Sequence, residues 1–355
     1  MINNRILAAR ALCSARQLDG LLFLGLTSIR YLAGFTGSDG ALLVGGNDQW
    51  FLTDSRYTTQ ATTEAAHCQV REYRQKMEGI AALVKEQGWQ RLGFDGEQTT
   101  VAQHRGLAEL LPTVELVPLG AEPDGLRLIK EPGEISLLGD CAAIASNALL
   151  AIMPAIKPGV RERDLALELE MAMKRAGAEE KSFDFIVASG VRGAMPHGKA
   201  SEKTLARGEL VTIDFGAVYQ GYHSDETVTL VVGEEDERQR EIYGIVKEAH
   251  ARALAAVRPG VTCKELDDLA RGYIADRGYG AYFGHGLGHG VGLDVHEKPV
   301  VSFRNEQPVT EGMVFTIEPG IYIPGWGGVR IEDTVVVTAD GYRLLTMVPK
   351  ELIRV

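Results

Sequence analysis

Four acidic residues occupy matching places in two stretches of this 355-residue sequence. In the first stretch a hydrophobic run ends in Asp214-Phe215-Gly216, and Asp225 follows after a ten-residue spacer. In the second a similar run ends in Glu318-Pro319-Gly320, and Glu332 follows further along the chain. A carboxylate on a buried strand is costly unless a cation or hydrogen-bond donors compensate its charge. These four residues are therefore candidates for binding metal ions.

Each pair of acids is expected to face its partner across a β-hairpin. A turn between Tyr219 and Gln220 would place the two aspartates directly opposite each other, and a turn at Gly325 would do the same for the two glutamates. Like charges in such positions repel, so either the pairs lie at a solvated edge or positive charge lies between them. Two divalent cations would neutralise four carboxylates.

A glycine-rich stretch at residues 284–292 adds nitrogen ligands to this set. It contains neither a G-x-G-x-x-G dinucleotide loop nor an H-E-x-x-H motif. Six of the eight histidines fall between positions 197 and 296, and five of them are candidate ligands or substrate residues: His197, His223, His285, His289 and His296. An oxygen-rich ligand set favours manganese or cobalt, with zinc as an alternative, and the scattered cysteines exclude a thiolate site.

Composition narrows the class of protein. The chain carries 48 acidic and 37 basic residues, a net charge of −11, which argues against a nucleic-acid partner. The longest apolar candidate, Leu21–Phe35, is interrupted by Arg30, so we expect no membrane span and no signal peptide. The four cysteines form no C-x-x-C pair, and free buried thiols in a reducing cytoplasm are expected.

The length predicts two domains, which we place at residues 1–123 and 124–355. The first reads as alternating helices and strands, with a linker at Ala121–Gly125. Strands are expected at Gly20–Leu26, Ala41–Gly45 and Gln49–Thr53, and helices at Ile80–Gln87 and from Pro132 onward.

The second domain contains a weak internal repeat. Lys157-Pro158-Gly159-Val160 is matched by Arg258-Pro259-Gly260-Val261, and the two carboxylate-bearing strands follow in the same order. This order predicts a duplicated helix–helix–strand–strand unit whose two halves face each other.

Five ordered motifs in the second domain resemble those of the Xaa-Pro peptidases, the prolidases and aminopeptidases P. The motifs are Thr212-Ile213-Asp214-Phe215-Gly216, Tyr222-His223-Ser224-Asp225, residues 288–297, Thr316-Ile317-Glu318-Pro319-Gly320 and Val329-Arg330-Ile331-Glu332-Asp333. The resemblance implies an α/β (α+β) chain. A smaller creatinase-type N-terminal domain would come first in the sequence, followed by a pita-bread catalytic domain with internal pseudo-twofold duplication. In that first domain, residues 34–40 and 53–57 resemble the aminopeptidase P branch more than strict prolidases.

The resemblance also implies roles for individual residues. Asp225 and Glu332 would bridge two metal ions, Asp214 would bind one of them, and His289 with Glu318 would bind the other. Glu318 would also carry a proton to the leaving proline nitrogen. The histidines His197 and His296 would hold the substrate carbonyl, and three further residues would shape the substrate site: His285, Tyr322 and Arg330. A structural alternative for Arg330 is a strand residue paired with Asp333 or another acid.

The expected activity is hydrolysis of the bond before proline, as an Xaa-Pro aminopeptidase or alternatively an Xaa-Pro dipeptidase. Proline-containing peptides are the implied substrates, and a cytoplasmic homodimer is the implied assembly. One departure concerns the substrate rim, because Val191–Met195 replaces an Asn-rich turn before Pro196-His197. The absence of a G-x-S-x-G motif argues against serine chemistry. Methionine aminopeptidase typically lacks the first domain, creatinase lacks the metal ligands, and a non-catalytic peptide-binding scaffold would have lost some of them.

Overall fold

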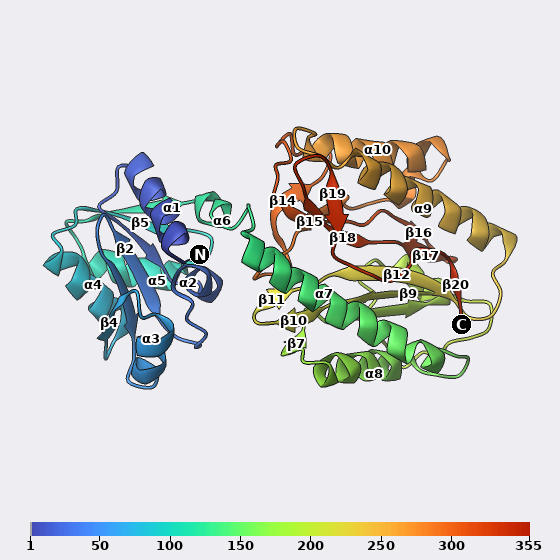
Figure 1. Cartoon of the computed structure of the whole chain (residues 1–355), viewed down its shortest axis with the longest axis horizontal. Coiled ribbons are helices and arrows are strands. Elements are labelled where there is room, and N and C mark those ends of the chain that lie inside the picture. The colour runs from blue at the N-terminus through green and yellow to red at the C-terminus, as the bar shows by residue number, and fades with distance from the viewer. Residues whose placement is uncertain (1) are drawn as a thin grey trace. The chain divides into compact units, whose positions relative to one another are not determined.

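The computed structural model describes residues 2–355, which form two compact units (Figure 1). The first unit ends at Arg127 and the second begins at Leu128. The segment interpreted as a linker contains a short helix, α6 at Glu122–Gly125, with Pro123 in its first turn. Proline suits a first turn because its missing N–H would have no partner there. The boundary predicted after residue 123 therefore falls inside α6.

The first unit is built on a six-stranded mixed sheet. The strand order is β4-β3-β2-β1-β5-β6, antiparallel among β3, β2 and β1 and parallel at both ends. The strands are β1 (Gly20–Phe23), β2 (Ala41–Gly45), β3 (Gln49–Thr53), β4 (Gln69–Glu72), β5 (Arg91–Asp95) and β6 (Glu115–Leu119). The helices are α1 (Ile2–Ala15), α2 (Leu26–Ala33), α3 (Thr58–Glu64), α4 (Lys76–Glu86) and α5 (Val101–Leu110), besides α6.

Both faces of this sheet are covered. Leu22 and Leu43 pack in one core with residues of α4 and α5. The neighbouring Leu21 and Leu42 are just as buried, and successive strand residues point to opposite faces. The predicted strands β2 and β3 are confirmed residue for residue, whereas β1 ends at Phe23 because α2 begins at Leu26.

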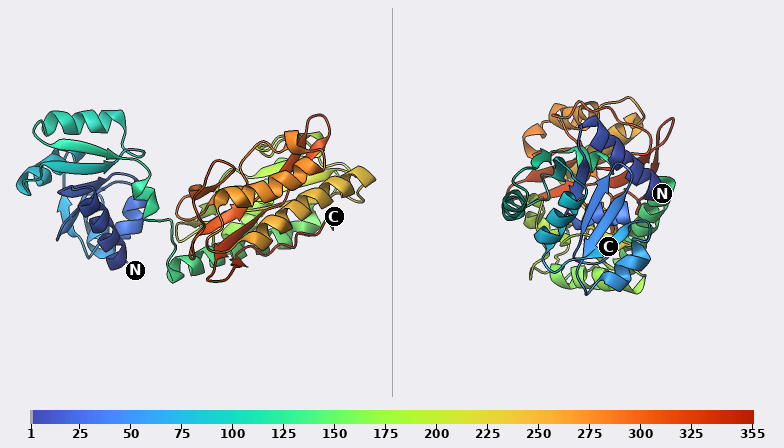
Figure 2. Two further views of the ribbon diagram at one scale, coloured as in Figure 1. Left: turned by 90° about the horizontal axis from the view of Figure 1, so that it is seen from above. Right: turned by 90° about the vertical axis from the view of Figure 1, so that its left-hand side faces the viewer.

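The second unit holds two larger sheets and two pairs of packed helices (Figures 1 and 2). The sheet orders are β20-β12-β9-β8 and β14-β13-β15-β18-β19, with small sheets β11-β10-β7 and β16-β17 beside them. The strands are β7 (Glu180–Lys181), β8 (Ile186–Ser189), β9 (Leu210–Phe215), β10 (Ala217–Tyr219), β11 (Tyr222–His223), β12 (Glu226–Val231), β13 (Gly288–Gly290), β14 (Glu297–Val301), β15 (Val314–Ile317), β16 (Gly320–Ile323), β17 (Gly327–Arg330), β18 (Asp333–Val337), β19 (Tyr342–Leu344) and β20 (Ile353–Arg354). The helices are α7 (Pro132–Ile152), α8 (Glu162–Arg175), α9 (Glu237–Ala256) and α10 (Cys263–Asp276), with short 3₁₀ turns η1 (Met153–Ala155), η2 (Gly190–Ala194) and η3 (Gly280–Tyr282).

The predicted duplication of this unit is confirmed. The order helix, helix, strand, strand occurs first as α7, α8, β9 and β12 and then as α9, α10, β15 and β18. Each half buries its own apolar core: Leu149, Leu169 and Ile213 belong to the first, and Val246 and Leu266 belong to the second. The carboxylate-bearing strands of the two halves therefore come from separately packed layers that meet inside the unit.

Helix α7 is a stretch that the expectation about membrane spans overlooked. Together with η1 it is long and apolar enough, by length and composition alone, to cross a membrane. In the structure its residues Cys141, Ala145 and Leu149 lie in the core of the first half. Of the 18-residue apolar stretch within Pro132–Ala155, 39% is buried. Core helices commonly share this composition, because a helix with a wide buried stripe is apolar on most sides.

The first predicted hairpin register is wrong by two residues. The turn is centred on Gln220 and Gly221, whose φ angles are 48° and 76°, as a two-residue type I′ turn requires. Asp214 consequently pairs with Thr227, and Asp225 lies in the break just before β12. The second predicted turn, at Gly325, is confirmed, because β15–β18 and β16–β17 continue one register in which the two glutamates are opposite.

Candidate metal centre

The acids of the predicted site come from strand ends of both halves. Asp214 is the penultimate residue of β9 and Asp225 immediately precedes β12. Glu318 follows β15, and Glu332 lies between β17 and β18. Hydrogen bonds hold the halves together here: for example, the Glu332 N–H donates to the carbonyl of Thr227, and the Thr334 hydroxyl donates to the carbonyl of Asp225 at 2.7 Å.

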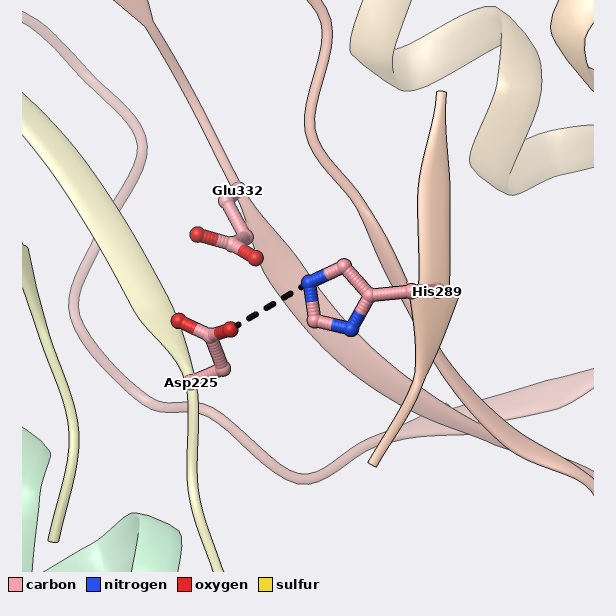
Figure 3. A group of neighbouring side chains, drawn as sticks. All are labelled: Asp225, His289 and Glu332. Atoms are coloured by element: carbon pink, nitrogen blue, oxygen red, sulfur yellow. Dashed lines mark ion pairs between the residues drawn. The ribbon is translucent and has the colours of Figure 1, made fainter. Parts of the chain in front are cut away.

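Asp225, His289 and Glu332 form a compact group of potential ligands (Figure 3). One side-chain atom from each lies within 4.8 Å of the other two. His289 Nε2 is 3.5 Å from Asp225 Oδ2 and 3.5 Å from Glu318 Oε1. Three different strand regions supply these atoms. Because the atoms lie so close together, one cation could contact all of them.

His289 is held in the form that a metal ion requires. Its Nδ1 is 3.1 Å from the carbonyl of Gly290. A carbonyl oxygen only accepts, so Nδ1 carries the hydrogen and Nε2 presents its lone pair to the acids. Burial, followed by the charge of His296, lowers the pKa of His289 to about 4, so the ring is neutral at physiological pH.

Without a cation, the ionised forms of these buried carboxylates are electrostatically unfavourable. Burial first, and then the charges of Glu332, Asp214 and Glu318, raise the pKa of Asp225 well above its usual value. Burial, followed by the charges of Glu318 and Asp214, raises the pKa of Glu332 in the same way. Burial also raises the pKa of Glu318 to about 8. Like charges in a low-dielectric pocket disfavour ionisation, and divalent cations would reverse the effect.

Two buried oxygens provide a direct test of whether a cation fits. Among residues 2–355, Asp214 Oδ1 and Asp225 Oδ1 are buried side-chain atoms without a hydrogen-bond partner. Buried polar atoms are nearly always satisfied in native proteins. The unpaired oxygens, the neutral imidazole and the oxygen-rich donor set together fit divalent metal ions.

Arg330 compensates only part of this negative charge. Its Nη2 donates to Asp214 Oδ2 at 2.6 Å, and its Nη1 donates to the hydroxyl of Tyr322 at 2.9 Å. It also donates to the carbonyl of Pro196, the residue before His197. The pairing with an acid is therefore present, but the acid is a predicted ligand and not Asp333.

The predicted substrate residues lie around the centre at different depths. The Tyr322 hydroxyl donates to His285 Nε2 at 2.9 Å, and His285 Nδ1 donates to the carbonyl of Gly286. The His296 ring lies 4.3 Å from the His289 ring, centroid to centroid. His197 and His296 are both exposed, and the charge of His197 contributes to lowering the pKa of His296 after loss of hydration. His296 thus lies beside the predicted ligand His289, and His285 lies beside Tyr322.

Two threonines beside the centre are absent from the predicted site. The Thr227 hydroxyl donates to Glu332 Oε2 at 2.6 Å and accepts from Arg330 Nε. The Thr316 hydroxyl lies 3.4 Å from Glu318 Oε1 and accepts the N–H of His289. Thr227 stands two residues after Asp225, and Thr316 stands two residues before Glu318. In a strand, residues two apart lie on the same face. This spacing in the sequence could have predicted both threonines.

A buried acid anchors the loop that carries His197. Nothing in the sequence pattern predicted this role. Glu162, at the start of α8, is 0% exposed and accepts hydrogen bonds from the N–H and hydroxyl groups of both Ser189 and Ser201. Its carboxylate also pairs with Arg192, which in turn donates to the carbonyl of Lys199. Glu162 therefore holds both ends of the segment around His197.

Replacing Glu162 by Gln should loosen this loop. The amide is nearly isosteric but loses the ionic pairing with Arg192, so we expect stability to fall by about 1–3 kcal/mol and the KM for substrate to rise. Urea unfolding and steady-state kinetics measure the two effects. Glu202→Gln is the matched control, since Glu202 pairs with Arg161 and Arg163 at the exposed surface and such pairs contribute little. An unchanged KM in Glu162→Gln would contradict this role.

Two sheets from a duplicated unit, with acids and a histidine at their junction, define the pita-bread class of fold. Residues 136–339 match metallopeptidase family M24, and residues 5–129 match the creatinase/prolidase N-terminal domain. An uncharacterized peptidase of Bacillus subtilis is 45% identical over 95% of this chain and 96% of its own length. An Xaa-Pro dipeptidase of Pyrococcus horikoshii is 53% identical over 64% of this chain and 65% of its own.

Solved structures agree with the sequence relatives. An Xaa-Pro dipeptidase from Bacillus anthracis superposes with a TM-score of 0.98 at 43% identity and covers both chains completely. An X-Pro aminopeptidase from Thermotoga maritima superposes with a TM-score of 0.90 at 38% identity, over 97% of this chain and 98% of the other. The chain therefore belongs to metallopeptidase family M24, whose members use divalent metal ions, and it carries a creatinase/prolidase N-terminal domain.

Proposed function

We propose that this protein hydrolyses the peptide bond before proline in short peptides. The observation that carries the proposal is the set of five predicted ligands, Asp214, Asp225, His289, Glu318 and Glu332, gathered at the junction of the two halves with two buried oxygens unpaired. Relatives named Xaa-Pro dipeptidase and X-Pro aminopeptidase over nearly the whole chain support the proline specificity.

The five ligands would hold two divalent metal ions, and manganese suits their oxygen-rich composition best, with cobalt or zinc as alternatives. When bound, such ions supply Lewis acidity toward water and the scissile carbonyl. The Glu318 carboxylate takes a proton from the attacking water and delivers it to the leaving proline nitrogen. That nitrogen carries no hydrogen in the peptide, so recognition must rely on the carbonyl and the ring.

The histidines around the ligands complete the substrate site. His197 and His296 stand at the exposed side, where each can donate a hydrogen bond to the carbonyl oxygen as negative charge develops on it. Arg330 fixes Tyr322, and Tyr322 fixes His285, which leaves the His285 ring as a wall beside the proline ring.

Peptide length separates two candidate activities. The motifs of the first domain favour an aminopeptidase, whereas the likeness to the Bacillus anthracis Xaa-Pro dipeptidase, with its TM-score of 0.98, favours dipeptide substrates. Assays of Ala-Pro and Ala-Pro-Ala with added manganese distinguish the two. In either case EDTA should abolish turnover, and manganese should restore it. Equal turnover of Ala-Ala and Ala-Pro would contradict the proposed specificity.

We further propose that the protein is a cytoplasmic homodimer. The four cysteines are free, three of them buried, which suits a reducing compartment. The dimer follows from the family resemblance, and light scattering on the purified full chain tests it.

A further inference from the structure

A second cluster of charges lies immediately behind the candidate metal centre. Its two acids, Glu226 and Asp333, each follow a predicted ligand by one residue, since Asp225 precedes the first and Glu332 precedes the second. Neighbouring strand residues point in opposite directions. The side chains of Glu226 and Asp333 therefore lie on the side of their strands away from the ligands, and both are buried, at 1% and 3% exposure.

Lys350 joins these two acids. Its Nζ lies 2.5 Å from Glu226 Oε1 and 3.3 Å from Asp333 Oδ1, and its side chain is 12% exposed. His250 Nε2 lies 3.3 Å from the other oxygen of Asp333, but burial lowers the pKa of His250 to about 3 and so leaves it neutral. Among residues 2–355, Lys350 is the charged side chain that contacts both carboxylates.

The C-terminal segment supplies further donors to the same pair. The Thr346 hydroxyl donates to Asp333 at 2.6 Å, and the Val348 N–H donates to Glu226 at 3.0 Å. Ser146 on α7 donates to the second oxygen of Glu226. The C-terminal segment at residues 346–350 and Ser146 of α7 thus bind the two acids, and neither belongs to the strands that carry the ligands.

This cluster spans the junction between the two halves. Glu226 begins β12 of the four-stranded sheet and Asp333 begins β18 of the five-stranded sheet. Ligand atoms must be held to within about 0.5 Å for tight metal binding. Without a cation between them the two acids would repel each other and strain this junction, which backbone and threonine hydrogen bonds also hold. The ammonium of Lys350 opposes that separation one residue away from each ligand.

We propose that Lys350 is a positioning residue for the metal centre: by joining Glu226 to Asp333 it fixes the spacing of Asp225 and Glu332. It acts through its neighbours and contacts neither metal nor substrate. The inference rests on the metal-binding part of the proposed function and is independent of the peptide specificity.

The first test is Lys350→Met, which removes the ammonium and keeps the aliphatic chain. Titration calorimetry of the metal-free full chain with manganese should show a dissociation constant raised about 10- to 100-fold. At saturating manganese, kcat should fall while KM for the peptide stays unchanged, because the substrate residues are not displaced. Lys247→Met is the matched control: it removes an exposed ion pair with Glu351, next to Lys350, and should bind manganese as the wild type does.

The double variant Glu226→Gln/Lys350→Met separates positioning from charge balance. The wild-type cluster has two carboxylates and one ammonium, a net charge of −1, and the double variant keeps Asp333 alone, also −1. It should fold and still bind manganese weakly, because the connection between the strands is lost. Wild-type manganese affinity in either variant overturns the proposal.

Two further outcomes remain informative. If both variants fail to fold, Lys350→Arg, which keeps the charge and alters the geometry of the connection, must show weakened manganese binding, and wild-type affinity there overturns the proposal. A wild-type protein that binds manganese but cleaves neither Ala-Pro nor Ala-Pro-Ala rejects the proposed peptidase specificity alone, since calorimetry uses no peptide.

Discussion

Replacing Glu318 by Gln is expected to reduce kcat for an Xaa-Pro peptide by at least about 1,000-fold, since one side chain is both a metal ligand and the proton carrier. The amide cannot take a proton from water at neutral pH. Binding of manganese should be weakened but not abolished, because the other four ligands remain. Stopped assays with Ala-Pro at saturating manganese measure the loss.

The fold should tolerate this substitution. The Glu318 carboxyl accepts one long hydrogen bond, from Thr316 at 3.4 Å, and its buried charge is unfavourable enough to raise its pKa to about 8. A neutral amide of the same shape removes that cost, so thermal unfolding of the metal-free variant should occur no lower than in the wild type. Glu311→Gln, at an exposed position seven residues earlier, is the control. Wild-type turnover in Glu318→Gln would remove Glu318 from the proposed chemistry.

Replacing Asp225 by Asn should change the stability of the metal-free and metal-bound protein in opposite directions. At manganese concentrations 100 times Kd, the wild type should gain about 2.7 kcal/mol, or about 5–10 °C in Tm. The variant should lose most of that gain, because Asp225 lies in the group that can contact one cation together with His289 and Glu332.

The metal-free variant should in turn be more stable than the metal-free wild type. Burial, followed by the charges of three neighbouring acids, raises the pKa of Asp225, and its Oδ1 has no hydrogen-bond partner. Asn carries no charge to desolvate. Calorimetry with EDTA and with manganese gives both signs, and Asp140→Asn on the exposed side of α7 is the control. A metal-free variant that melts below the wild type, or one that manganese stabilises fully, would contradict this account.

Local sequence determined several elements of the fold. Short apolar runs bounded by Gly, Asn or Asp residues were sufficient to predict β2 and β3. The start of α7 followed from Pro132 in the first turn, and the structure adds a capping box between Glu131 and Glu134. The first hairpin register was missed because the positive φ of Gln220, a non-glycine residue, is weakly signalled by its type.

In the candidate site, too, the sequence determined some features and the tertiary structure determined others. By itself the sequence determined which residue types could bind metal, since carboxylates at strand ends and histidines between glycines are local features. Only the tertiary structure placed Asp225 beside His289 and Glu332, left two oxygens unpaired, and set Lys350 behind them. These contacts join two separately packed sheets across long stretches of chain. No local periodicity encodes them, because the packing of the two cores decides which strand ends meet.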